Sequence, residues 1–231
     1  MRALPPARRL RFELVADALE RFAAGRPLRL LDAGCGDGEF AAAIARRYLS
    51  WSVVGVDLAD DMLERGRAAV AGLSNVELVH TDITAGLGSK TYDAVVAIES
   101  LEEIPDDTAA LRAMVAALRP SGLLVAHVPE RDWKPVLPGS DPTWRNEVRH
   151  GYVAEELEGR LRDLGLEDVR VEETSRSLVR AGQELRDRIS PQRPSLRAAV
   201  SSALAVTVPL ERAGLTWGPA RAFLIRARRP G

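Results

Sequence analysis

One segment of the chain combines glycines and carboxylates densely enough to bind a ligand. Residues 30–40 read LLDAGCGDGEF, an apolar stretch that runs into a glycine-rich turn and then into a helical pattern. Glycines permit a tight turn and a close approach of a ligand to the backbone, and the start of a helix offers free N–H groups. The segment therefore predicts a ligand site where a strand ends.

The spacing and charge of this turn discriminate between two classes of ligand. Dinucleotide sites favour G-x-G-x-x-G with a pyrophosphate over the helix end, whereas these glycines follow G-x-G-x-G and position 39 is Glu. Asp32 and Asp37 would lie beside the pyrophosphate, which is electrostatically unfavourable. A cationic ligand suits them better, and a glycine turn without a ligand is the alternative.

The rest of the chain predicts an α/β fold that presents this turn. Nearly unbroken apolar runs alternate with helical patterns, which is typical of a parallel sheet with helices on both faces. The predicted strands are 28–32, 52–57, 76–80, 92–98, 123–128, 169–174 and 222–227. The predicted helices of this pattern are 10–24, 39–48, 60–71, 108–118 and 153–164.

The chain divides into a core with additions at both ends. The segments are an N-terminal helix in 1–27, the sheet core in 28–174, a helical insertion in 175–220, and the final strand and tail in 221–231.

Within the core, prolines and glycines break the pattern over residues 129–152. A loop of that length in a compact domain is typically a lid or a binding loop. It carries Trp133 and Trp144, large apolar side chains that we expect to face a substrate.

The composition excludes several classes of protein. The 231 residues hold 32 Lys+Arg against 33 Asp+Glu, so the basic surplus of a nucleic-acid-binding protein is missing. The single cysteine, Cys35, excludes an internal disulfide and a cysteine-based metal site, and three scattered histidines form no ligand cluster, so we expect no metal. No run reaches the roughly 18–20 apolar residues of a membrane span, and no secretion signal opens the chain. We expect a cytoplasmic protein.

The glycine turn resembles a known family motif. DAGCGDG at 32–38 is similar to the glycine motif of class I S-adenosylmethionine (SAM)-dependent methyltransferases. Four further motifs resemble the family's in the same order: VVGVD at 53–57, HTDI at 80–83, YDAVVA at 92–97 and LRPSGLL at 118–124. The resemblance implies a Rossmann-like, seven-stranded, mostly parallel sheet with an antiparallel last strand and a helical insertion before it.

The same resemblance implies SAM as the cofactor, S-adenosylhomocysteine as the product, and a role for particular residues. Asp57 would accept hydrogen bonds from both ribose hydroxyls, because one carboxylate can serve two adjacent O–H donors. The other implied cofactor residues are Asp32, Gly34 and Gly36 at the methionine, Leu58, Met62, Asp82 and Ile83 at the adenine, and Glu99 near the transferred methyl. The alternative for the two acids Asp57 and Asp82 is a helix cap or turn, and for Met62 a core position.

Three residues are candidate catalytic groups. ESLEEIPD at 99–106 resembles the E-x-L-E-H-[VI]-P-D stretch of small-molecule methyltransferases, with Glu103 where many relatives carry His. Glu103 could act as a base or bind a cationic acceptor, or could be a solvated acid at a helix start. His127 ends a strand at the ligand edge of the sheet, where it could act as a base or be structural. His150 is the third candidate.

EVRHGYVAEEL at 147–157 resembles a segment of methyltransferases from glycan and natural-product pathways. The resemblance implies that Arg149, His150 and Tyr152 lie near the substrate. A surface salt bridge for Arg149 and an exposed loop position for His150 are the alternatives. The insertion could roof a bulky or lipid-linked acceptor, form a homodimer contact through residues 178–210, or pack as two short helices.

The leading hypothesis is a SAM-dependent methyltransferase that methylates an O or N atom of a small molecule, such as a natural product, a sugar or an envelope glycan precursor. A catalytically silent SAM-binding partner or sensor is the second hypothesis, and an RNA or protein methyltransferase the third.

Overall fold

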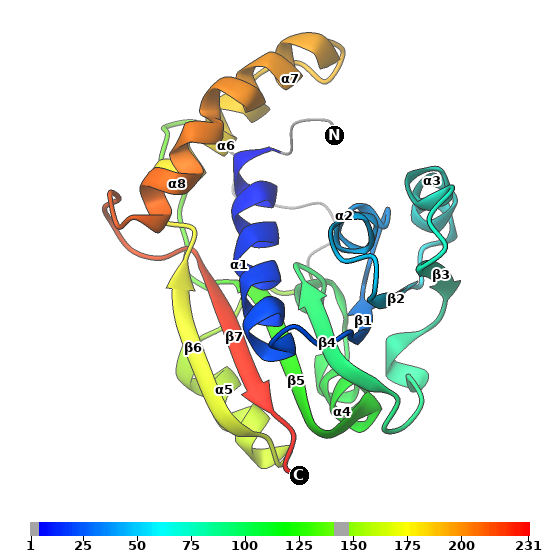
Figure 1. The fold of residues 1–231 in the computed structure, drawn as a ribbon. Helices are drawn as coiled ribbons and strands as arrows, with labels where there is room; N and C mark the ends of the chain where they lie inside the picture. The colour runs from blue at the N-terminus through cyan, green and yellow to red at the C-terminus, as the bar shows by residue number, and fades with distance from the viewer. Residues whose placement is uncertain (1–4, 141–147) are drawn as a thin grey trace.

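The fold is a single seven-stranded sheet covered by helices (Figure 1), seen in a computed structural model that describes residues 5–140 and 148–231. The strand order is β3-β2-β1-β4-β5-β7-β6. The strands are β1 (Arg29–Ala33), β2 (Ser52–Asp57), β3 (Val76–His80), β4 (Tyr92–Ile98), β5 (Leu118–Pro129), β6 (Glu167–Thr174) and β7 (Ala222–Arg228). Strands β1 to β5 pair in parallel, and β7 lies antiparallel between β5 and β6. The predicted fold class is confirmed.

Helices cover both faces of this sheet. The helices are α1 (Pro6–Ala23), α2 (Glu39–Arg47), α3 (Asp60–Val70), α4 (Asp107–Ala117), α5 (Ala154–Asp163), α6 (Ser177–Asp187), α7 (Pro194–Ala203) and α8 (Thr207–Arg212), with short 3-10 turns η1 (Ile83–Ala85), η2 (Leu101–Glu103) and η3 (Leu204–Val206). Leu19 of α1 and Ile44 of α2 belong to the core on one face. Met114 of α4 and Leu157 of α5 belong to the core on the other.

The apolar runs of the sequence explain this double cover. Successive side chains of a strand point to opposite faces of the sheet. Leu30 and Leu31 of β1 are both fully buried, Leu30 in the α1–α2 core and Leu31 in the α4–α5 core. A central strand therefore needs an unbroken apolar run rather than an alternating one.

The strand order places the glycine turn beside the end of β4. The chain leaves β1 toward β2 on one side and returns to β4 on the other, and ligands of open α/β sheets bind at such a reversal, beyond the carboxyl ends of the strands. The Ser100 hydroxyl donates to the Ala33 carbonyl at 2.9 Å and joins the two loops.

The insertion helices α6, α7 and α8 stand beyond this edge of the sheet, next to the start of α1 (Figure 1). Ala7 and Leu10 of α1 form a small apolar cluster with Val179 of α6 and Val208 of α8. Among the described residues, none of the helices has the length and apolar character that crossing a bilayer requires.

The segment predicted as a lid begins where β5 ends. Glu130 and Tyr152 form an isolated parallel bridge, which brings the two ends of the segment together. The predicted substrate residue Trp144 lies outside the described residues.

Candidate active site

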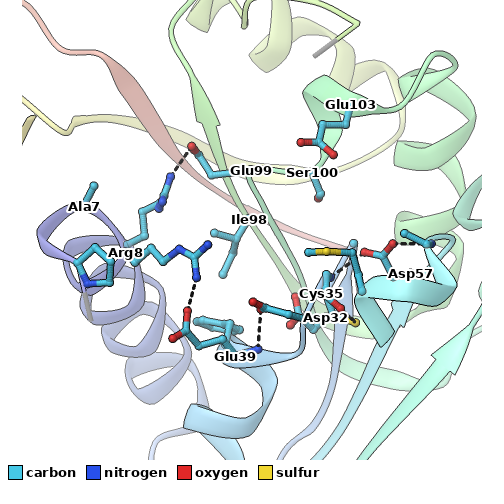
Figure 2. Close-up of a pocket in the computed structure, with 18 of the residues that line it drawn as sticks. Ala7, Arg8, Asp32, Cys35, Glu39, Asp57, Ile98, Glu99, Ser100 and Glu103 are labelled. Carbon is cyan, nitrogen blue, oxygen red and sulfur yellow. Dashed lines mark hydrogen bonds and ion pairs between the residues drawn. The ribbon is translucent and has the colours of Figure 1, made fainter. Parts of the chain in front are cut away.

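A cavity of about 1790 Å³ opens at the carboxyl ends of β1, β2 and β4, with the start of α1 beside it (Figure 2). The helices α6 and α7 supply further lining residues. All the predicted cofactor residues line the cavity: Asp32, Gly34, Gly36, Asp57, Leu58, Met62, Asp82, Ile83 and Glu99. The structure thus brings together residues that lie up to 67 positions apart in the chain, from Asp32 to Glu99.

The glycine turn contacts both Val56 of β2 and Ser100, which follows β4. The N–H groups of Gly34 and Cys35 both donate to the Val56 carbonyl at 2.9 Å. Gly34 has a φ of +80°, and a Cβ there would lie 2.3 Å from the Cβ of Ser100, so only glycine fits.

Asp57 is oriented by two backbone amides. Its Oδ2 accepts from the Gly36 N–H at 2.7 Å and its Oδ1 from the Ala59 N–H at 2.9 Å. Each carboxylate oxygen has a further lone pair. The braced carboxylate can therefore accept from two adjacent hydroxyls of a ligand in the cavity.

Asp32 is the most deeply buried acid of the site. It is 1% exposed, and its Oδ2 has no hydrogen-bond partner among the described residues. Burial, reinforced by the negative charge of Asp57, raises the pKa of Asp32 to about 7. A buried carboxyl without a partner is costly, and a cationic ligand group such as an ammonium would compensate it.

The cavity floor beside β2 and β3 is apolar. Leu58 is 62% exposed, whereas Ile83 is buried, and both line the cavity. Next to them, Asp82 caps η1, because its Oδ1 accepts from the Thr84 hydroxyl and N–H at 2.7 and 2.8 Å. These hydrogen bonds lower the pKa of Asp82. A flat aromatic ring with polar edges would fit this end.

Glu99 follows β4 and is held from two sides. Its Oε1 lies 2.8 Å from Nδ1 of His127, and its Oε2 forms an ion pair with Arg11 of α1. Burial alone would raise the pKa of Glu99, but Arg11 and His127 together lower it to about 2. Glu99 is therefore a fixed anion in the cavity wall.

Two further carboxyls follow Glu99, and their pKa values shift in the opposite direction. Burial, then the charges of Asp57 and Glu99, raise the pKa of Glu103, which lines the cavity. Glu102 is 3% exposed, its Oε2 has no partner among the described residues, and burial raises its pKa well above the usual range. Neighbouring acids with divergent pKa values can divide proton donor and acceptor roles. Glu102 was not predicted as a site residue, although it belongs to the quoted motif.

Among the described residues, the other predicted catalytic and substrate residues, His127, His150, Trp133, Arg149 and Tyr152, do not line this cavity. His127 is buried behind Glu99, with Nε2 3.1 Å from the Thr174 hydroxyl, so both ring nitrogens are engaged. His150 is exposed and lines neither described cavity. Trp133 stacks 4.0 Å from the Arg180 guanidinium and lines a separate cavity of about 440 Å³.

Arg149 and Tyr152 support the loop that carries Glu102. Arg149 donates to the carbonyls of Leu101, Ile104 and Pro105 at 2.8–2.9 Å. The buried Tyr152 hydroxyl donates to Asp107 at 2.9 Å. Both side chains thus contact protein groups behind the cavity wall.

Five arginines complete the cavity lining, and none was predicted from the sequence. Arg8 and Arg11 come from α1, and Arg180, Arg186 and Arg197 from α6 and α7. Among the described residues, no group of three or more His, Cys, Asp and Glu is arranged to hold a metal ion.

Comparison with known proteins gives this geometry a family. A family described as "Methyltransferase domain" matches residues 7–171. The chain is 34% identical over 113 residues to ubiquinone biosynthesis O-methyltransferase of Neisseria meningitidis, covering 47% of each chain. It is 33% identical over 100 residues to demethylmenaquinone methyltransferase of Staphylococcus aureus, covering 42% of each. The matches span about half the length of these curated relatives.

Solved structures share the fold over nearly the whole chain. The [4+2]-cyclase SpnF is 25% identical, with a TM-score of 0.64, and the match covers 93% of this chain and 82% of that one. Phosphoethanolamine N-methyltransferase 2 of Haemonchus contortus, solved in complex with S-adenosyl-L-methionine, is 19% identical, with a TM-score of 0.68 over 95% of this chain and 53% of that one. The family match covers well over half of the sequence and includes every cofactor residue that the motifs predict, and this chain belongs to the methyltransferase-domain family.

Proposed function

We propose that this protein binds SAM and transfers its methyl group to an O or N atom of a small molecule. The observation that carries the proposal is the placement of Asp32, Asp57 and Glu99 around one glycine turn, with Oδ2 of the buried Asp32 unpartnered in the part of the chain that the structure describes. The similarity to two quinone-pathway methyltransferases supports the reaction class.

Each part of the cofactor has a matching group in the cavity. The buried Asp32 carboxyl binds the ammonium of the methionine portion, and the braced Asp57 carboxylate accepts from the ribose hydroxyls. Leu58 and Ile83 pack against the adenine, with Asp82 at its edge. Bound SAM supplies an electrophilic methyl carbon on a sulfonium.

The protein's own contribution to transfer is alignment, exclusion of water and management of a proton. Glu102 and Glu103 lie where the acceptor would approach, and a carboxyl with a raised pKa is a stronger base once it is ionised. The cavity exceeds the about 300–1,000 Å³ of a typical ligand site, which leaves room for an acceptor beside the cofactor.

A second function has one specific observation in its favour. The similar structure SpnF is described as a [4+2]-cyclase, so a chain of this fold is associated with chemistry other than methyl transfer. Position 103 is Glu in this chain, whereas many methyltransferases with the E-x-L-E-H-[VI]-P-D stretch carry His there. This difference favours a chemistry other than theirs. The second candidate is therefore a SAM-binding protein that transfers no methyl group.

Calorimetric titration with SAM, S-adenosylhomocysteine and NAD tests the binding part of the proposal. Micromolar binding of the first two and none of NAD is the expected result, and absence of SAM binding contradicts both candidates. Release of S-adenosylhomocysteine in the presence of a panel of phenols, amines and sugars then separates them. Binding without turnover on any acceptor favours the second candidate.

The proposal extends to the location, the substrate class and the oligomeric state of the protein. We propose a cytoplasmic enzyme of secondary metabolism that acts on small molecules and not on nucleic acid. A homodimer contact through residues 178–210 is supported by exposed apolar side chains there, including Leu196 and Val206. Light scattering of the wild type and of Leu196→Glu tests it, and a monomeric wild type at high concentration contradicts it.

A further inference from the structure

The cavity wall is divided by charge. Among the described lining residues, the ends of β1 and β2 and the loops and helix starts that follow β1 to β4 contribute carboxyls and no cation: Asp32, Asp37, Glu39, Asp57, Asp82, Glu99, Glu102, Glu103 and Asp106. The helices α1, α6 and α7 contribute arginines and a single acid: Arg8, Arg11, Arg180, Arg186, Arg197 and Asp187. The carboxyl side contains the charged residues of the proposed cofactor site, and none of the five arginines belongs to that set.

Two of these arginines are neutralised across the cavity. Arg8 pairs with Glu39 at the start of α2, and Arg11 pairs with Glu99. Figure 2 shows the Arg8 side chain reaching Glu39 from α1. Their positive charge is therefore already compensated by the carboxyl side.

The pair Arg186 and Arg197 on α6 and α7 is compensated less completely. Both donate to the same atom, Oδ1 of Asp187, at 2.8 and 3.0 Å. The second oxygen of Asp187 accepts from Gln183 at 2.7 Å. One carboxylate thus serves two guanidinium groups, which leaves a surplus of positive charge on this wall.

This surplus charge is partly buried and held in place. The side chains of Arg186 and Arg197 are only 19% and 21% exposed, and Nε of Arg197 is buried with no hydrogen-bond partner in residues 5–140 and 148–231. Ser201 fixes the geometry, because its hydroxyl accepts from Nε of Arg186 at 2.9 Å and donates to the Arg197 carbonyl at 2.8 Å. Guanidinium groups bind planar and tetrahedral oxyanions through paired N–H donors.

We propose that Arg186 and Arg197 bind an anionic group, a carboxylate or a phosphate, carried by the acceptor molecule. The acceptor then has an anion at one end and the hydroxyl or amine that is methylated at the other, near Glu102 and Glu103. The inference rests on the proposed function in one respect, the assignment of the anionic group to the methyl acceptor. The anion site itself depends only on the α6–α7 wall.

The test titrates the full chain with two probes, pyrophosphate and benzoate, at constant ionic strength, and records binding by calorimetry. Saturable millimolar binding of either probe is expected, and the stronger probe distinguishes a phosphate from a carboxylate site. In the double variant Arg186→Gln/Arg197→Gln we expect binding to weaken by at least about tenfold. The control is Arg193→Gln, an exposed arginine of the same insertion that does not line the cavity, and it should bind within about twofold of the wild type.

A variant that should bind the probe more tightly, instead of more weakly, keeps the test decisive if the double variant folds poorly. Asp187→Asn removes the competing carboxylate and should tighten binding of the same probe severalfold. Binding that is absent in the wild type up to about 50 mM probe, or that is insensitive to all these substitutions, overturns the inference.

Titration of the same proteins with SAM separates this inference from the proposed function. SAM affinity should be equal in the wild type and the double variant, because neither arginine belongs to the proposed cofactor residues. SAM binding without probe binding rejects the anion site alone. Probe binding without SAM binding rejects the proposed function and retains the anion site.

Discussion

The Oε1 atom of Glu99 lies 2.8 Å from Nδ1 of His127, and this contact ties the end of β4 to the buried end of β5. The other carboxylate oxygen pairs with Arg11 of α1. Glu99 also has a φ of +51°, a left-handed conformation that is costly for a residue with a side chain and is common at functional sites. The carboxylate is therefore fixed toward the cavity before any ligand binds.

Replacing Glu99 by Gln should destabilise the protein by about 1–3 kcal/mol at pH 7, because Arg11 loses its ionic partner. The pKa of Glu99 is lowered from 4.5 to about 2, so the ionised group stabilises the fold above pH 4.5 and loses that effect as the pH falls toward 2. Urea unfolding at pH 7 and pH 3 should show the gap between wild type and variant closing at the lower pH. An equal gap at both values contradicts the ion-pair account.

The substitution Asp57→Asn should weaken SAM binding by about tenfold to hundredfold, because the amide nitrogen cannot accept from a ribose hydroxyl. Asp61→Asn is the matched control. Its carboxylate is 77% exposed on α3 and pairs with Arg65 one turn away. Calorimetry with SAM measures both, and unchanged affinity in Asp57→Asn removes this residue from the site.

Much of the sheet could be predicted from the sequence. Strands β2, β3 and β4 begin and end at the predicted residues, because each is an apolar run bounded by polar or turn-forming residues. Strand β5 begins five residues earlier than predicted, at Leu118, which pairs with Tyr92 before a register shift. The following residues, RPSG at 119–122, are typical of a turn, and they form an irregularity of the strand between the pairs Tyr92–Leu118 and Ala94–Leu123.

The placement of the predicted cofactor residues around one cavity could be foreseen, because they lie at or after the carboxyl ends of strands that meet at one edge of the sheet. The arginines could not. Arg11 and Arg186 belong to no motif, and their direction depends on how α1 and α6 pack over the cavity. Arg149 is the opposite case. Its motif is recognisable in the sequence, but its side chain donates to carbonyls of the η2 loop and does not line the cavity.

Gly34→Ala should destabilise the protein more strongly than an ordinary glycine substitution. Gly25 is the control, because it also has a positive φ but has open space where a Cβ would lie. We expect a cost of about 1 kcal/mol for Gly25→Ala, and about 3 kcal/mol or more for Gly34→Ala, since its Cβ would meet the Cβ of Ser100 at 2.3 Å. Equal midpoints in urea unfolding would show that the loops can separate without cost.

Asp32→Asn should raise stability while it removes affinity for SAM. The pKa of Asp32 is raised from 3.8 to about 7, so the folded state holds this proton more tightly than the unfolded state, and stability falls as the pH rises from 3.8 through 7. Asparagine avoids the buried charge, and the variant should be about 2–4 kcal/mol more stable at pH 8, with the difference vanishing near pH 4. Asp93→Asn is the contrasting control. Its carboxylate accepts from the Arg29 N–H and from Arg119, so its loss should destabilise the fold. If Asp32→Asn is instead the less stable protein at pH 8, the carboxyl has a structural partner and is not reserved for a cationic ligand.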